Sequence, residues 1–249
     1  ASSVALNAIM APKVDVAGPP GEWQADPSAP LGFLVGTRGI GGRIVHQDAY
    51  GPDNRYKSFV TVLSAAGPIK SYGTFKADRA PVTFGAGGVA TAPSEYADKM
   101  WFQYEPGRQP QPAALAQTGL PGGGTFPGWT AASKISGKAH TLVTLYQDSK
   151  FKSYPAGEPA HLYDGAEGIY GWDPRLDSTW PGGSGPCRLD DPATYVWINR
   201  PGLGALNWAL GLKENGKRVG GWGLSLDAVD VDAHVALENV CDANGWRVG

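Results

Sequence analysis

The chain has 249 residues, a formal net charge of −2 at pH 7 and 42% hydrophobic residues. This hydrophobic content can build a core, so wholesale disorder is excluded. The nearly balanced charge argues against duplex nucleic acid as the main partner, because phosphate binding needs clustered Lys and Arg. No apolar run approaches the roughly 20 residues that a membrane-spanning helix needs.

Composition also predicts a loop-rich fold. The chain contains 36 Gly and 21 Pro. Because glycine permits positive φ and proline fixes φ and removes a donor, we expect frequent turns and few long helices. The 9 Trp and 10 Tyr are expected to supply much of the buried apolar area.

The first 30 residues are predicted to form an extended N-terminal arm. This segment is rich in proline, starts with Ala rather than Met, and lacks the basic and apolar stretches of a secretory signal. Residues 31–49 are predicted to form two strands joined by a tight glycine hairpin turn at Gly36–Gly42. Residues 57–69 are predicted to form another strand that ends at Gly67 and Pro68.

The middle of the sequence alternates short strands with one long loop. The loop, residues 109–134, is rich in Gly and Pro and includes one predicted helical turn at Ala113–Gln117. The predicted strands are bounded by turn-forming residues, and the last strand leads into a turn. They are a hairpin at 71–88 and single strands at 98–107, 140–148 and 161–175.

Two helices are predicted, both near the C-terminus. The first is expected over Pro201–Leu212, with Asn199 or Arg200 at its cap and the proline in its first turn. The second is expected over Val231–Ala243, with Asp230 as N-cap and a glycine just after its last turn. These elements together predict a mainly β protein with two short helices.

Few motifs suggest chemistry. Gly36–Gly42 superficially resembles a phosphate-binding loop, but the residues after it read as a strand, whereas nucleotide loops open a helix. The histidines His46, His140, His161 and His234 are not paired at the spacing of metal ligands. We therefore expect neither a nucleotide site nor a histidine-based metal site.

The acidic residues and the cysteines have structural explanations. Asp227, Asp230 and Asp232 lie close together, but the glycine and bidentate Glu of a calcium loop are missing, and helix capping accounts for the last two. Cys187 and Cys241 fit no zinc or redox spacing. We expect two small buried apolar side chains, with a disulfide as the alternative.

The sequence also offers no clear set of catalytic residues for a hydrolase. Ser184 lacks the glycine spacing of a nucleophile elbow. Four aspartates could in principle supply a glycosidase acid and base, but they flank turn residues, where side-chain bonds to the local backbone are the commoner role. They are Asp173, Asp177, Asp190 and Asp191.

The C-terminal third carries short motifs in a specific order. Tyr170–Thr179, with the sequence YGWDPRLDST, precedes Tyr195–Pro201, which opens the first predicted helix. Gly221–Gly223 then leads to the cap of the second predicted helix, which ends near Cys241 and Asp242. This order resembles the central hub, or tail tip attachment, protein of lambda-type siphophages and related prophage and gene-transfer particles.

A second block supports the resemblance. Phe59–Ile69 is similar to the family's N-terminal strand and turn, and the matches together cover a little over half of the chain. Arg200 departs from the pattern, because the family usually has Asn directly before the proline. Family proteins continue well beyond this length, so we expect the chain to be the N-terminal part of a longer protein, or the ordered part of one.

The resemblance implies a division into domains. Residues 1–30 would be the arm, and residues 31–75 and 161–249 would form a hub domain of small β-barrel or tube-like structure that carries the two helices. Motif matches are lost over residues 76–160, which are therefore expected to form an inserted small β domain.

The resemblance also implies a structural role. The family forms a homotrimer that closes the distal end of the tail tube and opens for DNA passage. Expected partners are neighbouring tail-tube and distal tail proteins, tape-measure protein and DNA transiently in the lumen, and a host receptor reached through other parts of the full-length protein. The chain would assemble in the host cytoplasm and reside in the virion tail tip, with no enzymatic activity and no cofactor.

Several aromatic residues and one arginine of the matched region are expected to anchor the core or the interface. Trp197 and Trp208 are expected in the core. The full set is Trp172, Arg175, Trp180, Trp197, Trp208 and Trp222.

The alternative is a carbohydrate-binding or glycoside-hydrolysing β protein of a tail tip. Exposed Trp and Tyr side chains would stack on sugar rings in either case. A hydrolase would in addition need two carboxylates about 5–10 Å apart in an aromatic-lined cleft.

Overall fold

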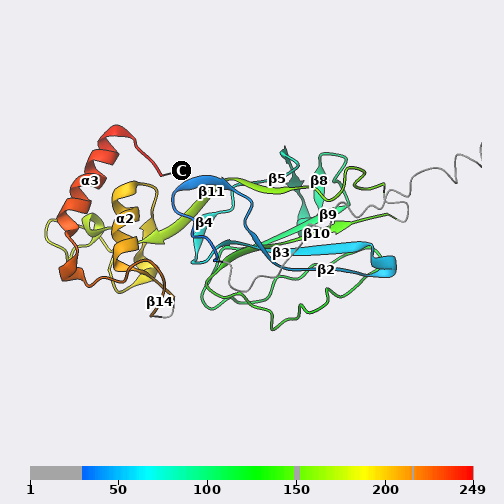
Figure 1. Ribbon diagram of the computed structural model, residues 1–249, viewed down its shortest axis with the longest axis horizontal. Coiled ribbons are helices and arrows are strands. Elements are labelled where there is room, and N and C mark those ends of the chain that lie inside the picture. The colour runs from blue at the N-terminus through cyan, green and yellow to red at the C-terminus, as the bar shows by residue number, and fades with distance from the viewer. Residues whose placement is uncertain (1–29, 149–151, 215, 249) are drawn as a thin grey trace, which may run out of the picture.

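The computed structural model describes residues 30–148, 152–214 and 216–248. These residues form an elongated molecule with a β body at one end and a helical module, the described residues from 172 onward, at the other (Figure 1). The prediction of a mainly β chain with two helices near the C-terminus is confirmed. None of the sheets in these residues closes into a barrel.

The central sheet has four antiparallel strands in the order β2-β3-β10-β9. They are β2 (Arg43–Tyr50), β3 (Tyr56–Ser64), β9 (Met100–Glu105) and β10 (Ala139–Tyr146). The two inner strands pair from Tyr56 opposite Tyr146 to Ser64 opposite Ala139. Both are buried along almost their whole length, polar Ser, Thr and His side chains included, so the two inner strands are covered on both faces.

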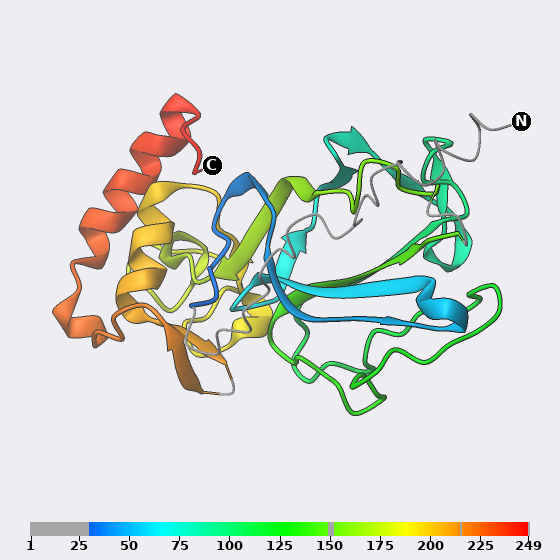
Figure 2. The ribbon, with the colours of Figure 1, turned by 45° about the vertical axis from the view of Figure 1, so that its right-hand side comes forward.

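The second sheet is built around the long strand β11 (His161–Gly171). Its partners are all antiparallel to it or to its neighbour β5. They are β1 (Thr37–Ile40), β4 (Ile69–Ser71), β5 (Thr74–Ala77), β6 (Ala80–Pro81) and β12 (Val196–Trp197). Strand β11 runs from the β body into the helical module, which Figure 2 shows clearly.

Two short hairpins complete the strands. One pairs β7 (Thr83–Phe84) with β8 (Ala90–Ala92), and the other pairs β13 (Leu212–Glu214) with β14 (Lys217–Gly220). The hairpin predicted over residues 71–88 is confirmed for β5 and β6. Its turn residues Asp78 and Arg79 both have positive φ, the conformation of a type I′ turn.

Two local predictions are wrong. β1 and β2 do not form a hairpin, because β1 pairs with β11 whereas β2 pairs with β3. The turn between them, with Gly42 at φ 70°, carries the chain from one sheet to the other. The helical turn expected at Ala113–Gln117 is not formed, and the segment is irregular loop that packs on the central sheet.

The main core lies between the two sheets. The central sheet contributes Phe59, Phe102 and Val143, and the β11 sheet contributes Phe75 and Tyr163. The Tyr163 hydroxyl and Thr141 Oγ1 are 2.6 Å apart and join the layers by a buried hydrogen bond. This contact satisfies two polar groups that burial would otherwise penalise.

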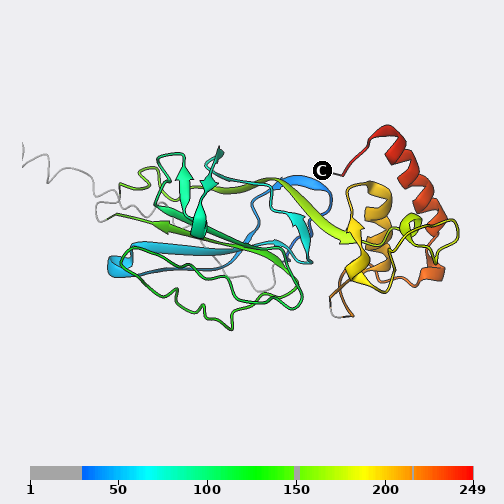
Figure 3. The same ribbon diagram turned by 180° about the vertical axis from the view of Figure 1, so that it is seen from behind.

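A long loop, residues 106–138, covers the other face of the central sheet. It runs along the outer side of β2 and β3 in Figures 1 and 3. Leu115 and Phe126 from the loop form a second core with Tyr56, Val60 and Trp101 of the sheet. The loop therefore takes the place of a third layer.

The two helices match their predicted positions. α2 spans Pro201–Leu210 and α3 spans Val231–Asn244. The Asp230 carboxylate caps α3 by accepting from Ala233 N, and Gly245 follows in the left-handed conformation. Arg200 stands at the N-cap position of α2 and offers no side-chain cap.

Asn207 of α2 joins the helix to the end of β11. Its Oδ1 accepts from Trp172 N at 2.8 Å, and its Nδ2 donates to Trp172 O at 2.9 Å. The amide thus pairs with the backbone of Trp172 as a neighbouring strand would. Gly171 makes this approach possible, since a Cβ there would lie 2.6 Å from Asn207 Oδ1.

The domain division remains a prediction. The expected arm lies outside the described residues, apart from its last position. Within the expected insertion, β9 and β10 share the central sheet with β2 and β3 of the expected hub domain.

Replacing Asn207 with Ala tests the docking of α2. The variant would leave the buried N–H and C=O of Trp172 unpaired, and we expect it to lower the free energy of unfolding by about 3 kcal/mol. Urea unfolding followed by tryptophan fluorescence measures the change. Asn244→Ala, at the exposed end of α3, is the control and should change the free energy by about 0.5 kcal/mol; equal losses would contradict this role of Asn207.

Candidate functional site

An ion-pair network holds α2, α3 and the turn after β11 together. At its centre is Glu238 of α3, which is fully buried. Its Oε2 accepts from Leu203 N at 3.0 Å, in the first turn of α2. The Glu238 carboxylate of α3 thus accepts a hydrogen bond from an N–H in the first turn of α2. It takes the role of an N-cap side chain, which Arg200 at the N-cap position does not supply.

Two arginines surround this carboxylate. Arg175 Nη2 and Arg200 Nη1 lie 3.7 and 3.8 Å from Glu238 Oε1. Arg175 also pairs with Asp173 at 2.7 Å and with Asp242 at 2.6 Å. Burial raises the pKa of Glu238 even though both arginines act in the opposite direction. The network therefore fixes the relative position of the two helices. Its charged side chains pair with one another within the helical module.

The sequence-predicted anchors divide into buried and exposed groups. Trp172 is buried, donates from Nε1 to Asp177 at 2.8 Å and meets the half-buried Trp180 edge-on. Trp197 is half-buried with the Lys70 ammonium 3.6 Å from its ring centre. Arg175 belongs to the ion network described above.

The remaining two anchors are exposed. Trp222 is 66% exposed, and Trp208 is 36% exposed and packs edge-on against Phe33. Leu224, 41% exposed, follows Trp222 by two residues, and its backbone pairs with Ala209, the residue after Trp208. We call these three residues the tryptophan surface.

The backbone under the tryptophan surface is well anchored. Trp222 N donates to Trp208 O at 2.9 Å, and Leu224 N donates to Ala209 O at 2.9 Å. Arg218 also donates to Trp222 O. The first two bonds satisfy carbonyls at the end of α2, and all three hold the backbone that carries the exposed indole of Trp222.

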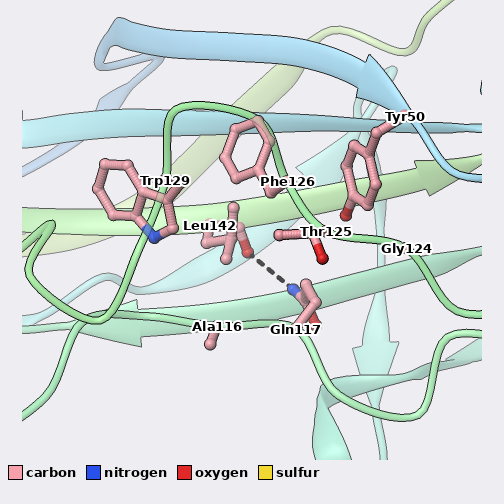
Figure 4. A pocket seen from close by; sticks show the side chains of 8 residues that line it. All are labelled: Tyr50, Ala116, Gln117, Gly124, Thr125, Phe126, Trp129 and Leu142. Carbon is pink, nitrogen blue, oxygen red and sulfur yellow. Dashed lines mark hydrogen bonds between the residues drawn. The ribbon is translucent and has the colours of Figure 1, made fainter.

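A separate hollow lies between the long loop and the central sheet (Figure 4). Its volume is about 150 Å³. Aromatic rings and short polar side chains form its walls, and no Asp, Glu, Lys, Arg or His is among them. The lining residues are Tyr50, Ala116, Gln117, Gly124, Thr125, Phe126, Trp129 and Leu142.

Sequence reasoning did not identify this hollow. Its residues come from β2, β10 and the long loop, which are far apart in the chain. The one available signal was the length of the loop, because loops of more than about 15 residues without secondary structure are commonly functional.

The other candidates from the sequence have structural roles in the described residues. Cys187 and Cys241 are both buried and unpaired. No cluster of three or more metal-ligating side chains occurs where the structure is described. In the same residues, no helix is long and apolar enough to cross a membrane.

The histidines are dispersed. His46 Nε2 is 2.7 Å from Pro127 O of the long loop, and His234 Nδ1 is 3.2 Å from Gly202 O. His161 packs between Phe59 and Phe75 with its Nε2 unpartnered, and burial lowers its pKa to about 4. Burial also lowers the pKa of His140.

Comparison with models of known protein families gave no match. Comparison with curated proteins also gave no match.

Changing Glu238 in two ways separates its hydrogen bond from its charge. Glu238→Ala leaves Leu203 N unpaired and two arginines facing each other, so the free energy of unfolding should fall by about 3 kcal/mol. Glu238→Gln keeps an acceptor for Leu203 N and should lose about 1 kcal/mol. Urea unfolding measures both variants, with exposed Asp232→Ala as the control; equal losses for Ala and Gln would show that the hydrogen bond is unimportant.

Acid should destabilise the fold through His161. Its pKa is lower in the folded protein than the value near 6.5 of an unfolded chain, so the stability from the neutral ring is lost as pH falls from about 6.5 to 4. His161→Phe keeps the ring contacts and should remove up to about 3 kcal/mol of this loss. Unfolding free energies measured across this pH range test it, and an unchanged pH dependence in the variant would contradict it.

Proposed function

We propose that this chain is a structural subunit of a phage tail tip, a trimeric hub at the distal end of the tail tube. In this role it contacts neighbouring tail-tube and distal tail proteins and links the tube to host-recognition parts. Tape-measure protein and DNA occupy its lumen transiently, and a rearrangement of the subunits opens the path for DNA. Its place is the virion tail tip.

The tryptophan surface is the observation that carries the proposal. An indole that is 66% exposed on a fixed backbone leaves apolar area in water that association would bury. Tryptophan is also among the residues that contribute most to binding energy at interfaces. Because the backbone beneath it is already hydrogen-bonded, little conformational entropy is lost when a partner covers it.

The motifs that resemble the hub family also converge in space. Trp172, Asp173 and Arg175 after β11 contact α2 and α3 through Asn207 and the ion network. The exposed Trp222 lies in the link between these helices. The residues behind the resemblance therefore build one module, and that module presents the tryptophan surface.

Glycoside hydrolysis finds no support at the hollow. A glycosidase needs an acid and a base or nucleophile at either side of the scissile bond. The eight lining residues include no carboxylate.

Light scattering with mass determination tests the hub. We expect the purified chain to form trimers of the 26.1 kDa subunit as its concentration is raised. Trp222→Ser should weaken this association by about tenfold or more, because it removes an exposed anchor without touching the core. Its thermal unfolding should stay close to that of the wild type.

Trp129→Phe is the matched control, a tryptophan of the β body far from the tryptophan surface in sequence. It should leave the mass distribution unchanged. A wild-type chain that stays monomeric at high concentration would overturn the proposal, and equal weakening by both variants would remove the tryptophan surface from it.

A further inference from the structure

The exposed large apolar side chains of the described residues all belong to the helical module, and the β body contributes none of them. Three form the tryptophan surface, three lie on or just after α3, and one is in the turn after β11. They are Leu176, Trp208, Trp222, Leu224, Leu237, Val240 and Trp246. The module therefore carries a second apolar area besides the tryptophan surface.

This second area is the outer face of α3. Its residues follow one another at i, i+3, i+4, i+7 and i+10, so they line one side of the helix, and every one of them is exposed. They are Ala233, Ala236, Leu237, Val240 and Ala243. The opposite side, which includes Val231 and Cys241, is buried in the module. A helix that is apolar on two opposite sides is normally covered on both.

The backbone just past this helix is fixed. Gly245 N donates to Asp242 O at 3.2 Å, and Trp246 N donates to Cys241 O at 2.9 Å, the two hydrogen bonds of a Schellman motif. The residue after the glycine of this motif frequently packs back on the helix, yet Trp246 is 54% exposed. A partner that covers its indole therefore orders little additional backbone.

A closed trimer needs two different contact surfaces on each subunit. In a ring with threefold symmetry, a patch on one subunit meets a different patch on the next, whereas a patch meets itself only across a twofold axis. The contact inferred below rests on the trimeric hub proposed above, in which the tryptophan surface supplies one of the two patches. The outer face of α3 has the properties of the other.

The two surfaces are on different elements of the module. Figures 1 and 2 show α3 at the far end of the molecule and the β13–β14 hairpin, which leads directly into Trp222, at the lower edge of the module. The sizes of the side chains are also complementary. The outer face of α3 has three alanines, and their small side chains let a bulky indole ring approach the helix closely and be buried.

The charges beside the two surfaces are opposite. The β13–β14 hairpin carries three exposed cations, and its one acidic residue, Glu214, already pairs with Lys138 at 3.0 Å. The cations are Lys213, Lys217 and Arg218. By contrast, α3 contains no Lys or Arg, and the exposed Asp227, Asp230 and Asp232 stand at its start. Opposite charges next to two patches bring the matching surfaces together and disfavour contact of either patch with itself.

We propose that the tryptophan surface of one subunit packs against the outer face of α3 of the next subunit. In this contact Trp208 and Trp222 lie over the alanines and against Leu237 and Val240, while the basic hairpin meets the acidic start of α3. Repeated around the threefold axis, the contact closes the ring through the helical modules.

Variants of both surfaces test this contact by light scattering with mass determination. Trp222→Ser removes an anchor of one surface, and the double variant Leu237→Gln/Val240→Gln makes the other polar with a residue that favours helix. Each should weaken trimer formation by about tenfold or more. Leu176→Gln, at the exposed leucine outside both surfaces, is the matched control and should leave the trimer unchanged. Thermal unfolding of each variant confirms that it is folded.

Mixing the two weakened variants tests the pairing directly. Trp222→Ser chains keep an intact outer face of α3, and chains of the double variant keep an intact tryptophan surface, so one good contact remains between unlike chains. We expect equal mixtures to form dimers of the 26.1 kDa subunit at concentrations where each variant alone is monomeric. Native mass spectrometry with one variant isotope-labelled identifies the dimer as a mixed one.

The outcomes separate this contact from the hub itself. Wild-type trimers that the double variant leaves intact, equal weakening by Leu176→Gln, or mixtures that stay monomeric would overturn the contact alone. A wild-type dimer in place of a trimer would indicate a patch that meets itself across a twofold axis, and would overturn both the contact and the hub. A wild-type chain that stays monomeric would also overturn both.

Discussion

The pairing of Asn207 with the backbone of Trp172 is the contact on which the helical module depends. α2 has only ten residues, contains two glycines and lacks a side-chain cap of its own. Such a helix is not stable alone in water, because its few hydrogen bonds do not offset the cost of nucleation. It forms because Asn207 extends the hydrogen bonding of β11 into the helix, and because Glu238 of α3 satisfies its first turn.

Strand β11 connects the helical module to the β body, and it is hydrogen-bonded to other strands at both ends. In the β body it pairs with β1, β4 and β5, and at its far end it pairs with β12 beside the helices. A strand hydrogen-bonded along its length resists bending between the two ends. The tryptophan surface is therefore held in a fixed orientation relative to the sheets, which is what a subunit needs if its contacts are to set the shape of a ring.

The long loop has a different consequence. Residues 106–138 cover one face of the central sheet without forming a regular layer, so their packing is uneven and leaves a hollow with an unpartnered acceptor. The proposed interface and this hollow thus lie on different elements.

The sequence by itself determined the class of fold, most strands, both helices and the cap of α3, because these depend on local patterns of apolar residues, prolines and capping side chains. Only the tertiary structure decided which strand pairs with which, since β1 and β2 are adjacent in the chain yet join different sheets. It also decided that Trp222 is exposed, that Glu238 caps the other helix, and that loop residues and β2 form a hollow. Each of these depends on contacts between residues that are distant in the chain, and no local pattern encodes them.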